Sequence, residues 1–170
     1  MTTINRDSKT KDQPKTVADV MTRHVVTLGP HHSLSDSISL MAKHSFRHFI
    51  VIDVRGRLAG VVSDRDILRT LPRAKNWSTT SVSQFMTRDV LTVSPDAKLS
   101  VAMGQMLSKR VNCLPVVDDD QTLRGIVTST DLLKTFRFVQ EAIEKDAKAS
   151  AGEETGGRSR LEKQEAIVEL

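Results

Sequence analysis

Two short turns carry the residues with the clearest potential for binding chemistry. In each turn a hydroxyl residue ends an apolar run and a carboxylate follows three positions later, as Ser63 with Asp66 and as Thr128 with Asp131. This pattern is typical of a helix start, where backbone N–H groups are free, so the turn can offer amides, a hydroxyl and a carboxylate to one ligand. A ribose that carries a phosphate matches this set of groups.

The same pattern has a simpler explanation. An acid three positions after a serine or threonine also caps a helix, and its interaction with the helix dipole stabilises the start by about 0.3–1 kcal/mol. For one turn alone the cap is the better explanation. Two matched turns, each preceded by a glycine three positions before the hydroxyl residue, favour ligand binding, and the two roles are compatible.

The turns belong to an internal duplication. A shift of 65 positions places residues 17–70 on residues 82–135 without a gap and with 18 identities in 54 positions. Chance would give about one match in fifteen to twenty, so the sequence indicates two copies of one unit. Each copy is too small to bury its own core well, and we expect the two to pack on each other about a pseudo-two-fold axis.

Both copies predict the same order of elements. The first predicts a helical turn at 16–21, a strand at 25–28 and a helix at 33–41. A hairpin of two strands at 48–52 and 58–62 and a helix at 64–71 follow. The second predicts a capping box at Ser81 and Gln84, strands at 90–93, 113–117 and 123–127, and helices near 99–106 and from 129. The methionines Met41, Met103 and Met106 are expected in the core. The last helix has an apolar stripe at Leu132, Phe136, Val139 and Ile143, and the glycines of residues 150–157 predict a break.

Composition excludes several classes of protein. Of 170 residues, 38% are hydrophobic and 27% charged, and the net charge is +4. No apolar run approaches the ~20 residues of a membrane span, and without a signal region we expect a cytoplasmic location. The single Cys113 excludes an internal disulfide and is expected as a small buried hydrophobe. One tryptophan and no tyrosine argue against nucleic-acid binding, and the five histidines lack the spacing of a metal site.

The duplicated unit resembles the cystathionine β-synthase (CBS) domain, and the pair resembles a Bateman module. The resemblance rests on Met-Thr at 21–22 and 86–87, on segments 47–53 and 112–118, and on the two glycine-to-aspartate turns, and it covers roughly residues 16–138. Ile50 departs from the family, where proline is usual, as at Pro115. The resemblance implies an α+β fold of two tandem β-α-β-β-α repeats packed through their sheets. The expected divisions are a disordered leader 1–15, repeat 16–72, linker 73–80, repeat 81–138, and a C-terminal helix and flexible tail 139–170.

The resemblance also implies that AMP, ADP or ATP, or S-adenosylmethionine, binds in clefts built from both repeats, with an aspartate on the ribose. One predicted cleft combines Asp131, Thr128 and Thr130 with Thr22, Val26, Phe46 and Arg47. The other combines Asp66, Ser63 and Arg65 with Thr87, Leu91, Val111 and Asn112. Further candidates for phosphate contact are Lys109, Arg110 and Lys134. Because Thr130 stands where the first copy has Arg65, we expect the Arg65 cleft to favour di- or triphosphates.

These expectations combine into a regulatory module that binds an adenine nucleotide, forms a homodimer and acts on another protein. Catalysis is not expected, because no histidine is placed beside the lone cysteine and no serine lies in a nucleophile turn. The alternative is a ligand-free structural module that acts through dimerisation and its tail, residues 139–170.

Overall fold

The structure is a computed structural model that describes residues 13–44 and 46–165. Residues 14–132 form one compact unit, and the part of the last helix from Leu133 onward belongs to a second. Residues 1–12 of the predicted leader and residues 166–170 of the predicted tail lie outside the described residues.

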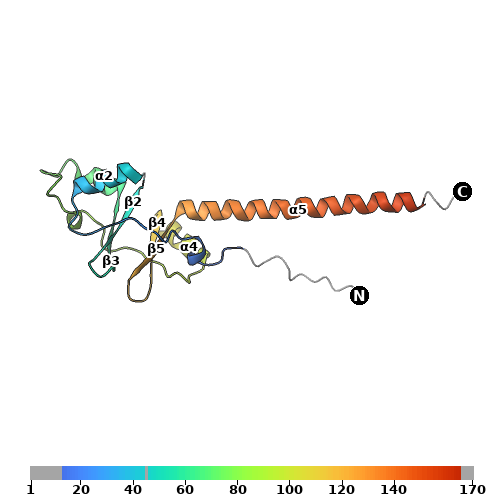
Figure 1. The fold of residues 1–170 in the computed structure, drawn as a ribbon, viewed down its shortest axis with the longest axis horizontal. Coiled ribbons are helices and arrows are strands. Elements are labelled where there is room, and N and C mark those ends of the chain that lie inside the picture. Colours follow the sequence, from blue (N-terminus) through green and yellow to red (C-terminus); the bar gives the residue numbers. More distant parts are fainter. Residues whose placement is uncertain (1–12, 45, 166–170) are drawn as a thin grey trace. The chain divides into compact units, whose positions relative to one another are not determined.

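The first repeat builds a three-stranded sheet with three helices (Figure 1). Strand β1 is parallel to β2, and β2 is antiparallel to β3. The capping box predicted at Thr16 is present, since the carboxylate of Asp19 accepts a hydrogen bond of 2.8 Å from the Thr16 N–H. The elements of this repeat are α1 (Val17–Val20), β1 (Thr27–Leu28), α2 (Leu34–His44), β2 (His48–Ile52), β3 (Leu58–Ser63) and α3 (Asp64–Thr70).

The second repeat follows the same order, but its sheet has only two strands, β4 and β5. The strand predicted at 90–93 does not form: Val93 alone bridges β4, through bonds from its N–H to Pro115 and from Val117 to its carbonyl. Pro115 has no N–H, so it cannot donate the bond that would extend this bridge into a ladder. The elements are η1 (Val82–Gln84), α4 (Leu99–Lys109), β4 (Cys113–Val117), β5 (Leu123–Thr128) and α5 (Ser129–Glu165).

The two main hydrophobic cores exchange their opening segments. Val17 and Met21, from the start of the first repeat, are buried among residues of the second, such as Leu114 and Val127. In the same way Val82 and Met86 complete the core of the first repeat. A third core, made of Ile50, Val61, Cys113 and Ile126, draws on the sheets of both repeats. The repeats therefore pack through their sheets, and each needs the opening segment of the other.

Backbone pairing fixes this exchange. Thr22 and Ile126 donate to each other over 2.9 and 3.0 Å, and Val61 and Thr87 do so over 2.9 Å in both directions. The hairpin turns of the two sheets also pair with each other, since Leu58 donates to the carbonyl of Gln121. These reciprocal contacts give the molecule its pseudo-two-fold symmetry.

Three further predictions of local structure were wrong. The Met103 side chain is 41% exposed, because the buried face of α4 runs through Leu99, Ala102 and Met106 instead. Ser81 does not cap η1; its hydroxyl bonds that of Ser83. The helix α5 continues through residues 150–157, where glycines lower helix stability by about 1 kcal/mol each without making the helical backbone impossible.

Candidate functional site

The two hydroxyl-to-aspartate turns have the same geometry. Oδ2 of Asp66 accepts hydrogen bonds from the N–H of Ser63 at 2.9 Å and from its hydroxyl at 2.6 Å. Oδ2 of Asp131 accepts the equivalent bonds from Thr128 at 2.9 and 2.6 Å. Both carboxylates therefore do cap their helices. Within the described residues, Oδ1 of Asp66 accepts none of the hydrogen bonds of this turn, which leaves that oxygen available to a ligand.

A cavity of about 260 Å³ opens beside the Asp66 turn. It is bounded by the ends of β2 and β3 and the start of α3 from the first repeat, and by residues 87–91 and 110–113 of the second. All seven residues that the sequence assigned to this cleft line it; they are Ser63, Arg65, Asp66, Thr87, Leu91, Val111 and Asn112. Their part in binding a ligand remains a prediction.

The bridge between Val61 and Thr87 brings the two halves of this cavity together. A Cβ atom on Gly60 would lie 2.6 Å from the carbonyl oxygen of Thr87, closer than real Cβ contacts. Only glycine therefore lets residues 86–87 lie against β3. On the opposite side Gly125 has the same role, with the carbonyl oxygen of Thr22 at 2.7 Å from the position of a Cβ.

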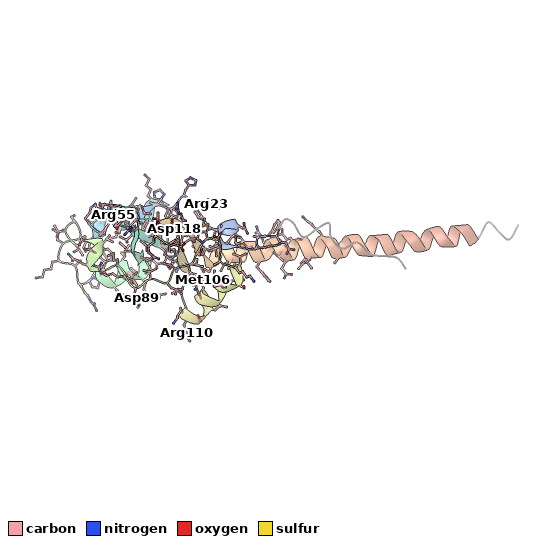
Figure 2. The ribbon with its side chains drawn as sticks, turned by 90° about the horizontal axis from the view of Figure 1, so that it is seen from below. Arg23, Arg55, Asp89, Met106, Arg110 and Asp118 are labelled. Atoms are coloured by element: carbon pink, nitrogen blue, oxygen red, sulfur yellow. The ribbon has the colours of Figure 1, made fainter. Side chains whose placement is uncertain are left out.

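Positive charge surrounds the mouth of the cavity. Arg47, Arg65, Arg69 and Arg110 line it, against the carboxylates of Asp64, Asp66 and Asp89. Arg110 ends α4 in the left-handed region, with φ of 55°, and lies on the same side of the molecule as Asp89 in Figure 2. The guanidinium of Arg47 donates to Asp64 over 3.2 Å. Burial opposes ionisation of Asp64, but this bond and one from the N–H of Arg65 hold its pKa below its usual value.

Two residues that are equivalent in the repeats, His48 and Cys113, meet in this cavity. Burial lowers the pKa of His48, a shift that the nearby Asp64 carboxylate partly offsets. Burial also raises the pKa of the Cys113 thiol to about 11. The neutral thiol agrees with the prediction of a small buried hydrophobe, and the cavity wall is apolar at this point.

The other predicted cleft is only partly assembled in the described contacts. The pairing of Thr22 with Ile126 brings the first repeat to within two residues of Thr128 on β5. Arg47, which was assigned to this cleft, lines the Asp66 cavity instead. Phe46 is 43% exposed and stacks on His44, with ring centroids 5.3 Å apart.

Sequence reasoning missed several residues of the Asp66 cavity. Arg69 lies three positions after Asp66, so helical spacing alone could have placed both on one face of α3. His48 and Cys113 directly follow two residues that were predicted, Arg47 and Asn112. Asp64 gave no signal, because its ion pair with Arg47 depends on how β2 and α3 meet.

Within residues 13–44 and 46–165, the described side chains include no group of three histidine, cysteine or acidic residues that could hold a metal ion. No helix within this described part of the chain is both long and apolar enough to cross a membrane.

Solved structures with the same fold are known. An acetoin utilization protein (AcuB) of Vibrio cholerae is 34% identical, with a TM-score of 0.70 over 76% of this chain and 96% of its own. CBSX2, solved with AMP, is 29% identical, with a TM-score of 0.67 over 75% and 99% of the two chains. The CBS domain pair of MJ0100, solved with 5'-methylthioadenosine and S-adenosyl-L-methionine, is 27% identical, with a TM-score of 0.65 over 71% and 94%.

Curated relatives with enzyme names are much longer than this chain. It is 29% identical over 155 residues to inosine-5'-monophosphate dehydrogenase of Methanocaldococcus jannaschii, a match that covers 91% of this chain and 30% of the enzyme. Such matches cover only the CBS part of the longer enzymes.

The profile of the CBS domain matches residues 17–73 and 82–137, so both copies of the duplication are covered. Together with the exchanged cores and the paired glycine turns, this match shows that the chain belongs to the CBS domain family as a tandem, Bateman-type pair.

Proposed function

We propose that this chain is a regulatory module that binds an adenosine nucleotide in the Asp66 cavity. The observation that carries the proposal is the assembly of seven residues, predicted from both repeats, around one cavity. AMP in CBSX2 and S-adenosyl-L-methionine in the MJ0100 pair support an adenosine compound as the ligand class.

The residues of the cavity suggest how such a ligand is held. A carboxylate accepts hydrogen bonds and donates none, so Oδ1 of Asp66 suits the ribose hydroxyls while Oδ2 keeps the helix cap. Leu91 and Val111 offer an apolar wall to the adenine. The phosphates face Arg65, Arg69 and Arg110, whose planar guanidinium groups bind phosphate oxygens in pairs.

Binding regulates only if it favours one conformation over another. A ligand in this cavity touches α3 and β3 of the first repeat and residues 87–91 of the second, so it acts on the way the repeats meet. The homodimer and the regulated partner protein implied by the resemblance belong to the same proposal.

Calorimetric titration of AMP, ADP, ATP and S-adenosylmethionine tests this proposal. Asp66→Ala is expected to weaken binding at least tenfold, because a charge-assisted hydrogen bond contributes about 1.5–3 kcal/mol. Asp36→Ala is the matched control, since Asp36 caps α2 with bonds of 2.9 and 2.8 Å from Ser33 and lines neither described cavity. Equal affinities in the two variants, or no binding by the wild-type chain, would reject the proposal.

A further inference from the structure

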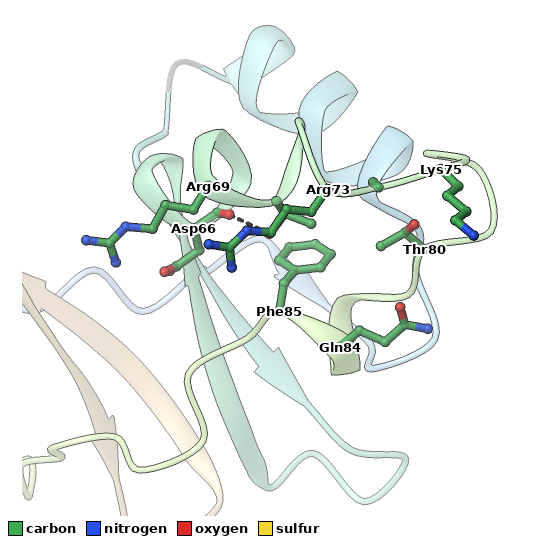
Figure 3. A pocket seen from close by; sticks show the side chains of 9 residues that line it. Asp66, Arg69, Arg73, Lys75, Thr80, Gln84 and Phe85 are labelled. Carbon is green, nitrogen blue, oxygen red and sulfur yellow. Dashed lines mark hydrogen bonds between the residues drawn. The ribbon is translucent and has the colours of Figure 1, made fainter.

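A second, larger cavity lies on the other side of α3. It has a volume of about 520 Å³ and is bounded by α3, by the loop that follows it, and by the segment around η1 (Figure 3). Nine residues line it: Asp66, Arg69, Thr70, Arg73, Ala74, Lys75, Thr80, Gln84 and Phe85. Its volume falls within the ~300–1,000 Å³ typical of small-molecule sites.

The lining is strongly basic. Three cations, Arg69, Arg73 and Lys75, line the cavity with one carboxylate, Asp66, whose Oδ2 is already engaged by Ser63. Across the described part of the chain, no ion pair joins any of these three cations to an acid. Like charges gathered around a concave surface repel one another and lower the free energy of a bound anion. The unpaired set therefore favours an anionic ligand.

The local backbone holds the two arginines on one side of the cavity. Arg69 and Arg73 are four residues apart, and the N–H of Arg73 donates to the carbonyl of Thr70 at 2.9 Å, which continues the turn of α3. In Figure 3 both guanidinium groups point to the left, that of Arg73 next to the ring of Phe85 and that of Arg69 beyond Asp66, while Lys75 lies at the opposite end. Two guanidinium groups at helical spacing can bind neighbouring phosphate oxygens.

We propose that this basic cavity is a second binding site, separate from the Asp66 cavity, for a small anion that carries phosphate. The arginines provide the charge, the hydroxyls of Thr70 and Thr80 and the amide of Gln84 provide neutral hydrogen bonds, and Phe85 provides an apolar wall. Arg73, Lys75, Thr80, Gln84 and Phe85 line this cavity and not the Asp66 cavity, whereas Asp66 and Arg69 line both.

The probe is sodium tripolyphosphate, titrated by calorimetry into the full chain at constant ionic strength. Wild type and the control Arg55→Gln are expected to bind with equal affinity, since Arg55 lies in the β2–β3 turn and lines neither described cavity. Arg73→Gln is expected to weaken binding at least tenfold. Its side chain is exposed, so the fold should survive, as thermal melting of both variants would check. Equal affinities in the two variants would overturn the proposal.

A second titration separates the two cavities. With AMP present at saturation to fill the Asp66 cavity, tripolyphosphate is still expected to bind one equivalent, with the same loss of affinity in Arg73→Gln. Loss of that binding would place the anion in the Asp66 cavity and overturn the proposal. If the chain fails to bind AMP at all, the proposed function fails, but the comparison of Arg73→Gln with Arg55→Gln still decides the second site.

Discussion

The two repeats share one order of elements but build sheets of different size. In the first, β1 pairs with β2 at Thr27 and Leu28, and Ile50 is the β2 residue opposite Thr27. In the second, Val93 forms a single bridge, because Pro115 stands where the first repeat has Ile50. One missing N–H therefore decides whether a short parallel strand forms, although the surrounding sequences are closely matched.

The repeats also differ in charge around their hydroxyl-to-aspartate turns. The glycines and aspartates that fix the backbone are identical in both, whereas Arg65 and Arg110 correspond to Thr130 and Ser45. The residues that fix the backbone of the turns are thus the same in both repeats, whereas the positively charged residues around the turns differ. If the proposed function holds, we expect the two clefts to distinguish ligands by phosphate content.

The largest loss of stability is expected from substitutions of Gly60 and Gly125, the equivalent glycines of the two repeats. Gly60→Ala would place a Cβ 2.6 Å from the carbonyl oxygen of Thr87, and Gly125→Ala would meet that of Thr22. Each change should lower the free energy of unfolding by about 3 kcal/mol, because the added methyl group is overpacked against the carbonyl oxygen and also distorts the hydrogen bonds of the neighbouring backbone bridge. Urea denaturation measures the loss, and the symmetry requires similar values for both.

Gly104→Ala provides the control for this pair. Gly104 lies in α4 with nothing within 4 Å of the position of a Cβ. Alanine there should stabilise the chain by about 0.5–1 kcal/mol, since it favours the helix. A strong loss at Gly60 with none at Gly125 would mean that the exchange of opening segments is not symmetric in its energetics.

Ile50→Pro would make the first repeat resemble the second. It removes the Ile50 N–H, which the parallel pairing of β2 with β1 needs, so the free energy of unfolding should fall by about 2 kcal/mol. Ile50→Val keeps the N–H and should cost only about 1 kcal/mol. Denaturation curves of both variants give the comparison, and equal losses would show that side-chain packing, and not the hydrogen bond, accounts for the difference between the sheets.

Arg65→Ala tests the difference in charge. If Arg65 contacts the outer phosphates, its loss should weaken ATP binding about tenfold, or about 1.4 kcal/mol, and change AMP binding less. Thr130→Ala, at the equivalent position, is the control and should leave ATP affinity unchanged. Calorimetric titration of both nucleotides measures these effects; unchanged ATP affinity in Arg65→Ala would remove the argument for unequal clefts.

The smallest effect is expected at His48, which occupies the position of Cys113 in the other repeat. Because burial lowers the pKa of His48 in the folded chain, the unfolded chain binds this proton more tightly. Its contribution to stability is therefore fully present above the ordinary pKa of 6.5 and declines as the pH falls through that value. Urea midpoints at about pH 7.5 and about pH 5.5 should differ less in His48→Gln than in wild type. An unchanged difference would assign the pH dependence to other groups.

Much of this fold could be predicted because the same pattern of strands and helices occurs in both repeats of the sequence. The runs at 48–52 and 113–117 are continuous and apolar, and the β2 and β4 strands coincide with them. The strand at 90–93 could not be excluded by pattern, because its absence depends on a proline 22 residues later. The apolar face of α4 was predicted wrongly because Ala102 and Met103 are adjacent and both apolar. The structure buries Ala102 and leaves Met103 partly exposed.

The Asp66 cavity was predictable where its residues belong to the repeated motif. The resemblance to CBS domains supplied the partners from the other repeat, such as Thr87 and Val111, which no local pattern could supply. The basic cavity behind α3 was not anticipated, because Arg73 and Lys75 lie just outside the matched segments and approach Phe85 only through the path of the loop.

The exchange of opening segments has a consequence for the ancestry of the chain. An ancestral gene for one repeat would have encoded a product with an unfilled core and an unpaired sheet edge. That product would have been stable only as a dimer in which each molecule packed its opening segment into the core of the other. Fusion of two gene copies placed the donor of that segment on the same polypeptide, at a high effective concentration. Each copy could then diverge in its surface chemistry without losing the assembly that both still require.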